Sequence, residues 1–162
     1  MCDVSDTKWL NSTEKEAWLG LLAVIHRAFP EIERGLQSHG LLGVHYHIFV
    51  ALSAAPDFTM GLSDLANTAN LSQSRLTHRM RILVDNGDIE ISPDPDDGRA
   101  KLATLTAVGR KRLAEVAPDH VATVRRIIFD RLTPSQTKAL ASALTPLAAG
   151  LSDHPEYLNP RQ

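Results

Sequence analysis

Residues 72–81 form a polar segment whose side chains suit contacts with nucleic acid. Its hydroxyl, amide, imidazole and guanidinium groups belong to Ser72, Gln73, Ser74, Arg75, Thr77, His78, Arg79 and Arg81. Arginine can donate two hydrogen bonds to guanine, glutamine can pair with adenine, and small hydroxyls can bind phosphate, all within a major groove. The alternative is an ordinary solvated helix face. We favour nucleic acid because solvated faces usually mix charges, whereas no Asp or Glu occurs from Ser72 to Val84.

A second group of cations follows in a loop rich in proline and aspartate. Arg99 comes after residues 92–98, and Lys101 follows it. A cation at a loop tip can enter a minor groove, where the negative potential is enhanced. We expect Asp97 to hold the Arg99 side chain by a charge-assisted hydrogen bond. The alternatives are an ordinary exposed salt bridge, which contributes little, and a calcium loop, which the prolines and the lack of a Glu at the twelfth position disfavour.

The elements around these residues predict a winged helix-turn-helix. Residues 62–69 predict a short helix, and Ser72 caps a second helix that runs to about Asn86 and ends at Gly87. Residues 89–91 and 101–105 predict two strands of a hairpin around the loop. The apolar residues of the second helix recur at helical spacing and should form its buried face: Leu76, Met80 and Leu83.

Long helices are expected on either side of this unit. The first begins at a cap on Ser12 or Thr13, is kinked or interrupted at Pro30, and stops near Gly40. A further helix covers residues 44–54.

Another long helix follows the unit. It starts at a cap on Thr106, with a kink expected at Pro118. Thr133-Pro134 then starts a last helix that reaches about Leu151.

Composition and charge agree with one globular domain. The chain has 162 residues, of which 43% are hydrophobic. Its net charge is −2, but residues 71–112 carry eight Lys/Arg and six Asp/Glu, so this segment has +2 and the rest −4. A protein that binds phosphates needs positive charge on one face rather than in total.

Other features exclude several classes of protein. No apolar run approaches the roughly 18–20 residues that span a bilayer. The first residues lack a signal-peptide pattern, so we expect a cytoplasmic protein without membrane contact. Phosphate-loop, nucleophile-elbow and paired-histidine protease motifs are absent, so we expect no enzyme and no cofactor. Cys2 cannot form an internal disulfide, and an incidental terminal cysteine is a better explanation than a redox sensor.

Four segments together resemble the MarR family of bacterial transcriptional regulators. They are LSDLA at residues 62–66, LSQSRLT at 71–77, DGR at 97–99 and LTAVG at 105–109. The resemblance extends from about Trp18 to Leu147. It implies a homodimer that places two winged lobes over a pseudo-palindromic operator, usually as a repressor released by a small, often aromatic or phenolic, ligand.

The same resemblance assigns roles by position. Ser72, Ser74, Arg75, Thr77 and His78 correspond to the helix that reads DNA, with Arg99 at the wing tip and Asp97 orienting it. The implied fold is mainly α with a small β-hairpin wing. Its regions are N-terminal dimerisation helices in 1–40, the winged lobe in 41–105, and C-terminal dimerisation helices with a loose tail in 106–162. Family members often carry Arg where this chain has Ile82, Asn86 and Ile91, which lowers the positive charge around the wing.

An effector pocket is expected between the dimerisation helices and the lobe. Its candidate lining residues are Trp18, His26, Tyr46, His47 and Phe49, which would suit a planar acid or phenol. For Trp18 and Phe49 the alternative is a place in the core.

Two alternative functions stay open. His39, His45, His47 and His120 suggest a zinc-responsive regulator, although residues 45 and 47 lie on different sides of a helix and no metal site is predicted. The other alternative is a degenerate winged helix that binds protein instead of DNA.

Overall fold

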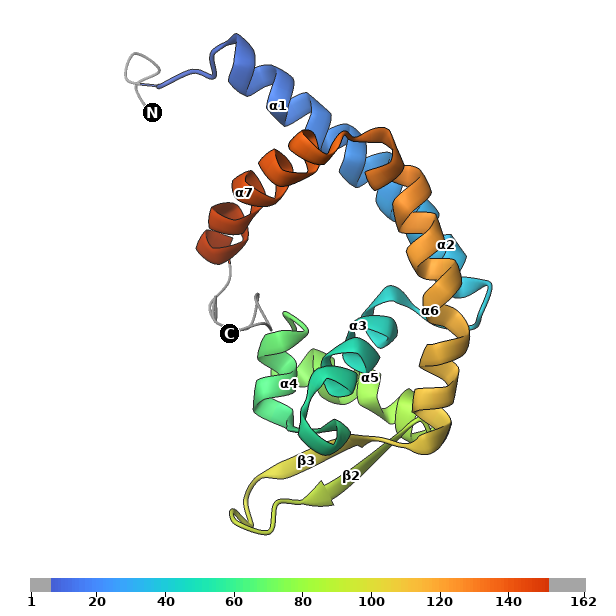
Figure 1. The fold of residues 1–162 in the computed structure, drawn as a ribbon. Coiled ribbons are helices and arrows are strands. Elements are labelled where there is room, and N and C mark those ends of the chain that lie inside the picture. Colours follow the sequence, from blue (N-terminus) through green and yellow to red (C-terminus); the bar gives the residue numbers. More distant parts are fainter. Residues whose placement is uncertain (1–6, 152–162) are drawn as a thin grey trace.

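The computed structural model describes residues 7–151 and consists of a lobe and a stem (Figure 1). The lobe, residues 41–105, contains three helices and a small sheet. The stem is built from the helices that precede and follow it. Cys2 and the tail at 152–162 lie outside the described residues.

The N-terminal helical segment is continuous but changes its winding. α1 (Ser12–Ala23) leads into a π-helical turn, η2 (Val24–Ala28), and then into α2 (Phe29–Gln37). The sequence predicts a kink or break at Pro30. The regular α-helical winding is interrupted just before it, where the path passes through the wider turn η2, because proline has no N–H to donate to the preceding turn.

The cap of α1 differs from the prediction by one residue. Asn11, not Ser12 or Thr13, accepts a hydrogen bond from the Glu14 N–H at 2.9 Å. The Glu14 carboxylate accepts one from the Asn11 N–H at 2.8 Å. This reciprocal pair satisfies two N–H groups at the helix start, and a single Ser or Thr cap would satisfy one.

The lobe confirms the winged helix-turn-helix and adds one strand to it. The sheet is antiparallel with the order β1-β3-β2, and Ile89 lies opposite Leu105 while Thr59 lies opposite Thr104. β2 and β3 are the predicted hairpin, whereas β1 was not predicted. The elements are α3 (Gly43–Ala54), η3 (Pro56–Phe58), β1 (Thr59–Gly61), α4 (Leu62–Thr68), α5 (Gln73–Asp85), β2 (Ile89–Pro93) and β3 (Lys101–Leu105).

Three helices end in the same backbone motif. Gly40, Asn70 and Gly87 have φ values of 69°, 52° and 73°, the left-handed region that glycine and asparagine tolerate best. In each case the next N–H donates to a carbonyl five residues back: Leu41 to Leu36 at 3.1 Å, Leu71 to Ala66 at 2.8 Å, and Asp88 to Leu83 at 2.9 Å. The predicted ends at Gly40 and Gly87 are therefore confirmed.

The hydrophobic core lies in the lobe and at its junction with the stem. Its large fully buried members come from the end of α2 and the turn after it, from α3, α4 and α5, and from the sheet: Leu36, Leu41, Ile48, Phe49, Leu52, Leu65, Leu76, Met80, Leu83, Ile89 and Leu105. The predicted buried face of α5 is thus confirmed.

The chain leaves the lobe along α6 (Ala107–Ile127), which packs against α2, and then passes η4 (Phe129–Arg131) into α7 (Pro134–Leu151). α6 runs through Pro118. At the predicted restart, the Thr133 N–H donates to Gln136 Oε1 at 2.9 Å and the Gln136 N–H to Thr133 Oγ1 at 3.3 Å. Among the helices of residues 7–151, none has the length and apolar character to span a membrane.

Candidate nucleic-acid interface

α5 has one buried and one exposed face. Ser72 begins it with extended backbone, and its Oγ accepts a hydrogen bond from the Arg75 N–H at 3.4 Å. Leu76, Met80 and Leu83 fix the helix to the core. The opposite face is held outward because these three apolar side chains occupy the inward positions of the helical repeat.

The predicted contact residues lie on this exposed face or at its edge. Arg79 is half-buried, and the others are exposed: Ser72, Gln73, Ser74, Arg75, Thr77, His78 and Arg81. The Thr77 hydroxyl donates to the Gln73 carbonyl at 2.9 Å. Its proton is thus engaged within the helix, which leaves its methyl group and oxygen lone pairs for an external contact.

The arginines of α5, the arginine of the loop between β2 and β3, and the lysine that begins β3 have no ion-pair partner within residues 7–151. They are Arg75, Arg79, Arg81, Arg99 and Lys101. Three arginines of α6 differ, because Arg112 binds Asp88, Arg125 binds Asp130, and Arg126 binds Glu31. The cations of α5 and of the wing are therefore available to bind an external anion.

The loop between β2 and β3 is ordered by its aspartates. Asp97 Oδ1 accepts from the Arg99 backbone N–H at 2.9 Å, and Asp94 Oδ1 accepts from the Asp96 N–H at 2.9 Å. The sequence predicts that Asp97 holds the Arg99 side chain. The contact in the structure is to the Arg99 backbone, because the short Asp side chain closes a local turn with the N–H two residues on.

The segment LTAVG at 105–109 attaches α6 to the end of α5. Thr106 Oγ1 accepts from the Gly109 N–H at 3.1 Å and lies 2.7 Å from the Gly87 carbonyl oxygen, to which it donates. A Cβ added to Gly109 would lie 2.2 Å from the Asp88 carbonyl oxygen. Only glycine permits this approach, so the motif serves the junction of the wing and the stem.

Solved structures share this fold over nearly the whole chain. No family model matches the sequence. AbsC, a MarR family transcriptional regulator from Streptomyces coelicolor, is 36% identical with a TM-score of 0.85, over 90% of this chain and 98% of AbsC. Sco3205, a MarR family transcriptional regulator from the same organism solved in complex with DNA, is 33% identical with a TM-score of 0.86, over 93% of this chain and 98% of Sco3205.

The chain belongs to the MarR family of transcriptional regulators. A curated relative agrees with this. The transcriptional regulator AdcR from Streptococcus pneumoniae is 28% identical over 109 residues, which are 66% of this chain and 73% of AdcR. MarR regulators are not enzymes, which agrees with the expectation from the sequence.

The five predicted effector residues of this MarR protein do not surround one cavity in the single chain. Phe49 is fully buried in the core, and Tyr46 is buried against the ring of His120 at 4.2 Å between centroids. Trp18, His26 and His47 are exposed. Phe49 thus takes the alternative place in the core, because it lies on the inward face of α3. Trp18 lies in α1 and His26 in η2, and this helical segment leads away from the lobe (Figure 1).

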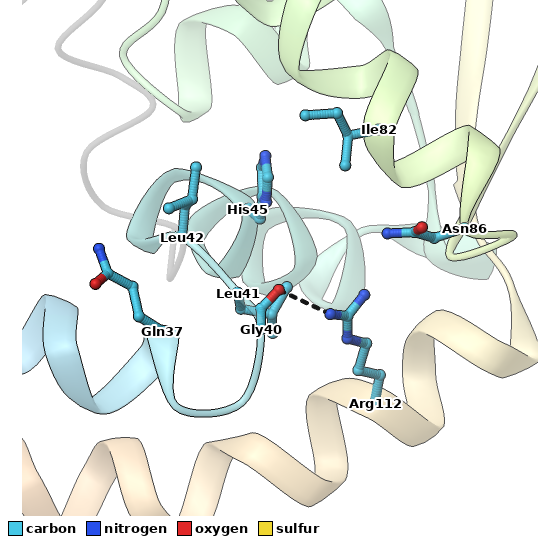
Figure 2. Close-up of a pocket in the computed structure, with 8 residues that line it drawn as sticks. All are labelled: Gln37, Gly40, Leu41, Leu42, His45, Ile82, Asn86 and Arg112. Carbon is cyan, nitrogen blue, oxygen red and sulfur yellow. Dashed lines mark hydrogen bonds between the residues drawn. The ribbon is translucent and has the colours of Figure 1, made fainter.

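A cavity of about 270 Å³ lies nearby, between the end of α2, the start of α3, the end of α5 and α6 (Figure 2). Its lining residues are Gln37, Gly40, Leu41, Leu42, His45, Ile82, Asn86 and Arg112. His45 is buried, and its Nε2 has no hydrogen-bond partner among residues 7–151. Burial, followed by the nearby Arg79 and Arg112, lowers the pKa of His45, which favours the neutral imidazole.

Sequence reasoning missed Asp88 and Arg112, which meet beside this cavity at 2.6 Å. Asp88 is 1% exposed. In the sequence, an acidic residue between Gly87 and Ile89 indicates a turn, and the partner of Asp88 lies 24 positions away. A polar residue placed directly before a buried strand is the one signal that pointed to it.

The four histidines considered for zinc do not converge on one site within residues 7–151. His39 Nε2 contacts Asp119 at 3.0 Å, whereas His120 packs on Tyr46. Burial, then the nearby His47, lowers the pKa of His120. Residues 7–151 contain no group of three or more His, Cys, Asp or Glu side chains placed to hold a metal ion.

Proposed function

We propose that this MarR regulator is a homodimeric repressor that binds a pseudo-palindromic operator and releases it when a small ligand binds. α5 enters the major groove, and the loop around Arg99 enters the adjoining minor groove. The observation that carries the proposal is the set of unpaired cations on α5 and the wing. The relative Sco3205, solved in complex with DNA, supports the same use of the fold.

A second copy of the chain is the proposed partner of the stem. α1 and α7 contain no buried residue although both carry large apolar side chains. Trp18, Leu19 and Leu147 are 50%, 64% and 56% exposed. Apolar area of this kind is characteristic of a surface that another subunit covers. We assign dimerisation to residues 1–40 and 106–162 and DNA binding to residues 41–105.

Binding to the DNA upstream of the chain's own gene tests the DNA-binding part. The full-length protein is titrated with this duplex and with a scrambled duplex at two salt concentrations. We expect preference for the natural duplex and a steep loss of affinity as salt rises, because phosphate contacts release counterions. Equal, weak binding to both duplexes would refute DNA reading. It would favour a protein-interaction module, for which the exposed Ile82 and Ile91 offer apolar contacts.

Repression is tested by transcription. A reporter under the natural promoter should be less active with the regulator present, and the Arg75→Ala variant should restore expression. A reporter that is activated by the wild-type protein would contradict the repressor role.

The cavity beside Arg112 is the proposed effector site. It combines a guanidinium, a buried neutral imidazole and the side chains of Leu41, Leu42 and Ile82. These groups suit a small planar acid, with the carboxylate at the Arg112 N–H groups that Asp88 and the Gly40 carbonyl leave unused, and the ring against the apolar wall. Operator binding should weaken in the presence of benzoate and not of its neutral isostere benzamide. No difference between the two compounds would remove an acidic effector, and a response to zinc and chelator would favour the metal-responsive alternative.

A further inference from the structure

α6 meets the end of α5 at three positions, spaced three residues apart on one face of the helix. Thr106 donates to the carbonyl oxygens of Gly87 and Asp88, and Gly109, which has no Cβ, lets α6 approach the Asp88 carbonyl closely. One turn later, Arg112 Nη1 donates to Asp88 Oδ2 at 2.6 Å. Residues three apart in a helix lie above one another. The end of α5 is therefore fixed to α6 through both its backbone and a side chain.

Through the other nitrogen of its guanidinium, Arg112 also binds the turn at the end of α2. Its Nη2 donates to the Gly40 carbonyl oxygen at 2.9 Å (Figure 2). Gly40 lies in the turn that ends α2, and α2 packs along α6. A single planar guanidinium thus joins α6, the end of α5 and the end of α2. A lysine ammonium is one point charge and lacks this fork, so it cannot reproduce both bonds in the same geometry.

The burial of Asp88 makes this contact persistent. The Asp88 side chain is 2% exposed and that of Arg112 is 26% exposed. A buried carboxylate without a cation is strongly disfavoured, so Asp88 retains Arg112 as long as the lobe is folded. The junction consequently behaves as a rigid clamp, which we define as Arg112, Asp88 and the Gly40 carbonyl.

We propose that Arg112 is a positioning residue for DNA binding: through the clamp it sets where α5 stands relative to the stem. The inference rests on the proposed function, because in a dimer the stem joins two copies of α5. The separation of the two helices then determines the spacing of half-sites that the protein accepts. Arg112 touches no base in this scheme, so its loss should change spacing tolerance rather than base preference.

The experiment compares wild type with Asp88→Leu/Arg112→Met. Replacing a buried ion pair by apolar side chains of similar size often leaves a fold as stable or more so, whereas Arg112→Met alone leaves a buried charge unpaired. Arg112→Lys is the conservative variant. Lys111→Met is the matched control, because Lys111 directly precedes Arg112 on α6 and its contact with Glu115, at 3.9 Å, is exposed.

Each full-length protein is titrated with the operator, with operators whose half-sites are moved by one or two base pairs, and with a single half-site. We expect the double variant to keep the wild-type melting temperature and half-site affinity. It should bind the natural operator about tenfold more weakly and lose its spacing preference. The operator affinity of Arg112→Lys should lie between those of wild type and the double variant, and that of Lys111→Met should match wild type.

Two results would overturn the inference while leaving the regulator intact. One is a double variant with wild-type operator affinity and spacing preference. The other is an equal loss on the single half-site, which would mean damage to α5 itself. A wild-type protein that prefers no duplex would refute the proposed function first, and the inference with it.

Discussion

The lobe and the two arms, α1 and α7, use apolar side chains in opposite ways. In the lobe, Phe49, Leu52 and Leu83 are covered by other elements of the same chain. In the arms no residue is buried, and large side chains such as Trp18 and Leu147 face outward. Stability of the lobe therefore comes from contacts within one chain. The arms carry an apolar surface that one chain leaves uncovered, which is why we assign them to a second copy.

Charged residues show a parallel difference between α5 and α6. Arg125 and Arg126 of α6 are each bound to a carboxylate within the stem. Arg75 and Arg81 of α5 have no such partner within residues 7–151. An arginine bound to a carboxylate is already neutralised, so an external polyanion gains more from the free ones. The comparison separates residues that hold the molecule together from residues that we propose contact DNA.

The largest effect is expected from charge placed in an arm. Leu144→Asp/Leu147→Asp puts carboxylates on the apolar face of α7 and should yield monomers. Operator affinity should fall by about 10²–10⁴-fold, because two lobes that are no longer linked cannot bind the two half-sites jointly. Sedimentation and operator titration measure both effects. Val50→Asp, at an exposed apolar position of the lobe, should leave the dimer intact; a dimeric double variant would end the assignment of the arms.

Two phenylalanines make the comparison quantitative. Phe49→Ala opens a cavity in the core and should cost about 3–5 kcal/mol of unfolding free energy at every protein concentration. Phe29 is 58% exposed, and Phe29→Ala should alter only the concentration-dependent part of the stability. Urea unfolding over a dilution series measures this. A large, concentration-independent loss for Phe29→Ala would mean that the start of α2 is stabilised within one chain.

Arg75 tests the free cations of α5. Arg75→Ala should weaken operator binding by about 1–3 kcal/mol and relax preference at particular base pairs. Competition with operators carrying single base changes measures the preference. Arg125→Ala, on the paired helix α6, is the control and should keep the base preference of wild type.

Arg99 should have a smaller and less selective effect. Arg99→Ala should weaken binding to natural and scrambled duplexes by a similar factor and reduce the salt slope by about 1. Titrations at four salt concentrations give the slope. An unchanged affinity on both duplexes would remove the wing from the interface.

The smallest effect concerns pH. Burial holds the pKa of His45 below its ordinary value of 6.5, so the unfolded chain takes up its proton first as pH falls. His45 therefore contributes stability that is present above pH 6.5 and is lost on acidification, and His120 adds a slope of the same sign. The urea midpoint should fall from pH 7.5 to pH 5.5, less steeply in His45→Leu. A slope in His45→Leu identical to that of wild type would show that another group causes the pH dependence.

Local signals in the sequence were sufficient for most elements of the lobe. Ser72 at a cap, Gly87 at a helix end and the spacing of Leu76, Met80 and Leu83 predict α5, because caps, left-handed turns and helical periodicity depend on neighbouring residues. β1 was not predicted: Thr59–Gly61 is three residues long and includes a glycine. Its strand character comes from pairing with β3, more than 40 residues later.

By itself, the sequence determined the fold class, the position of α5 and the resemblance to MarR regulators. The tertiary structure alone decided which charges stay free and which are bound. Asp88 looks like a surface acid in the sequence, and it is one of the most buried side chains because Arg112 reaches it from α6. Likewise, Phe49 belongs to the core and not to a ligand site, while the cavity gathers residues from four separate elements. Which distant segments meet, and which charged groups they pair and bury, depends on the arrangement of the whole chain, and no local pattern encodes it.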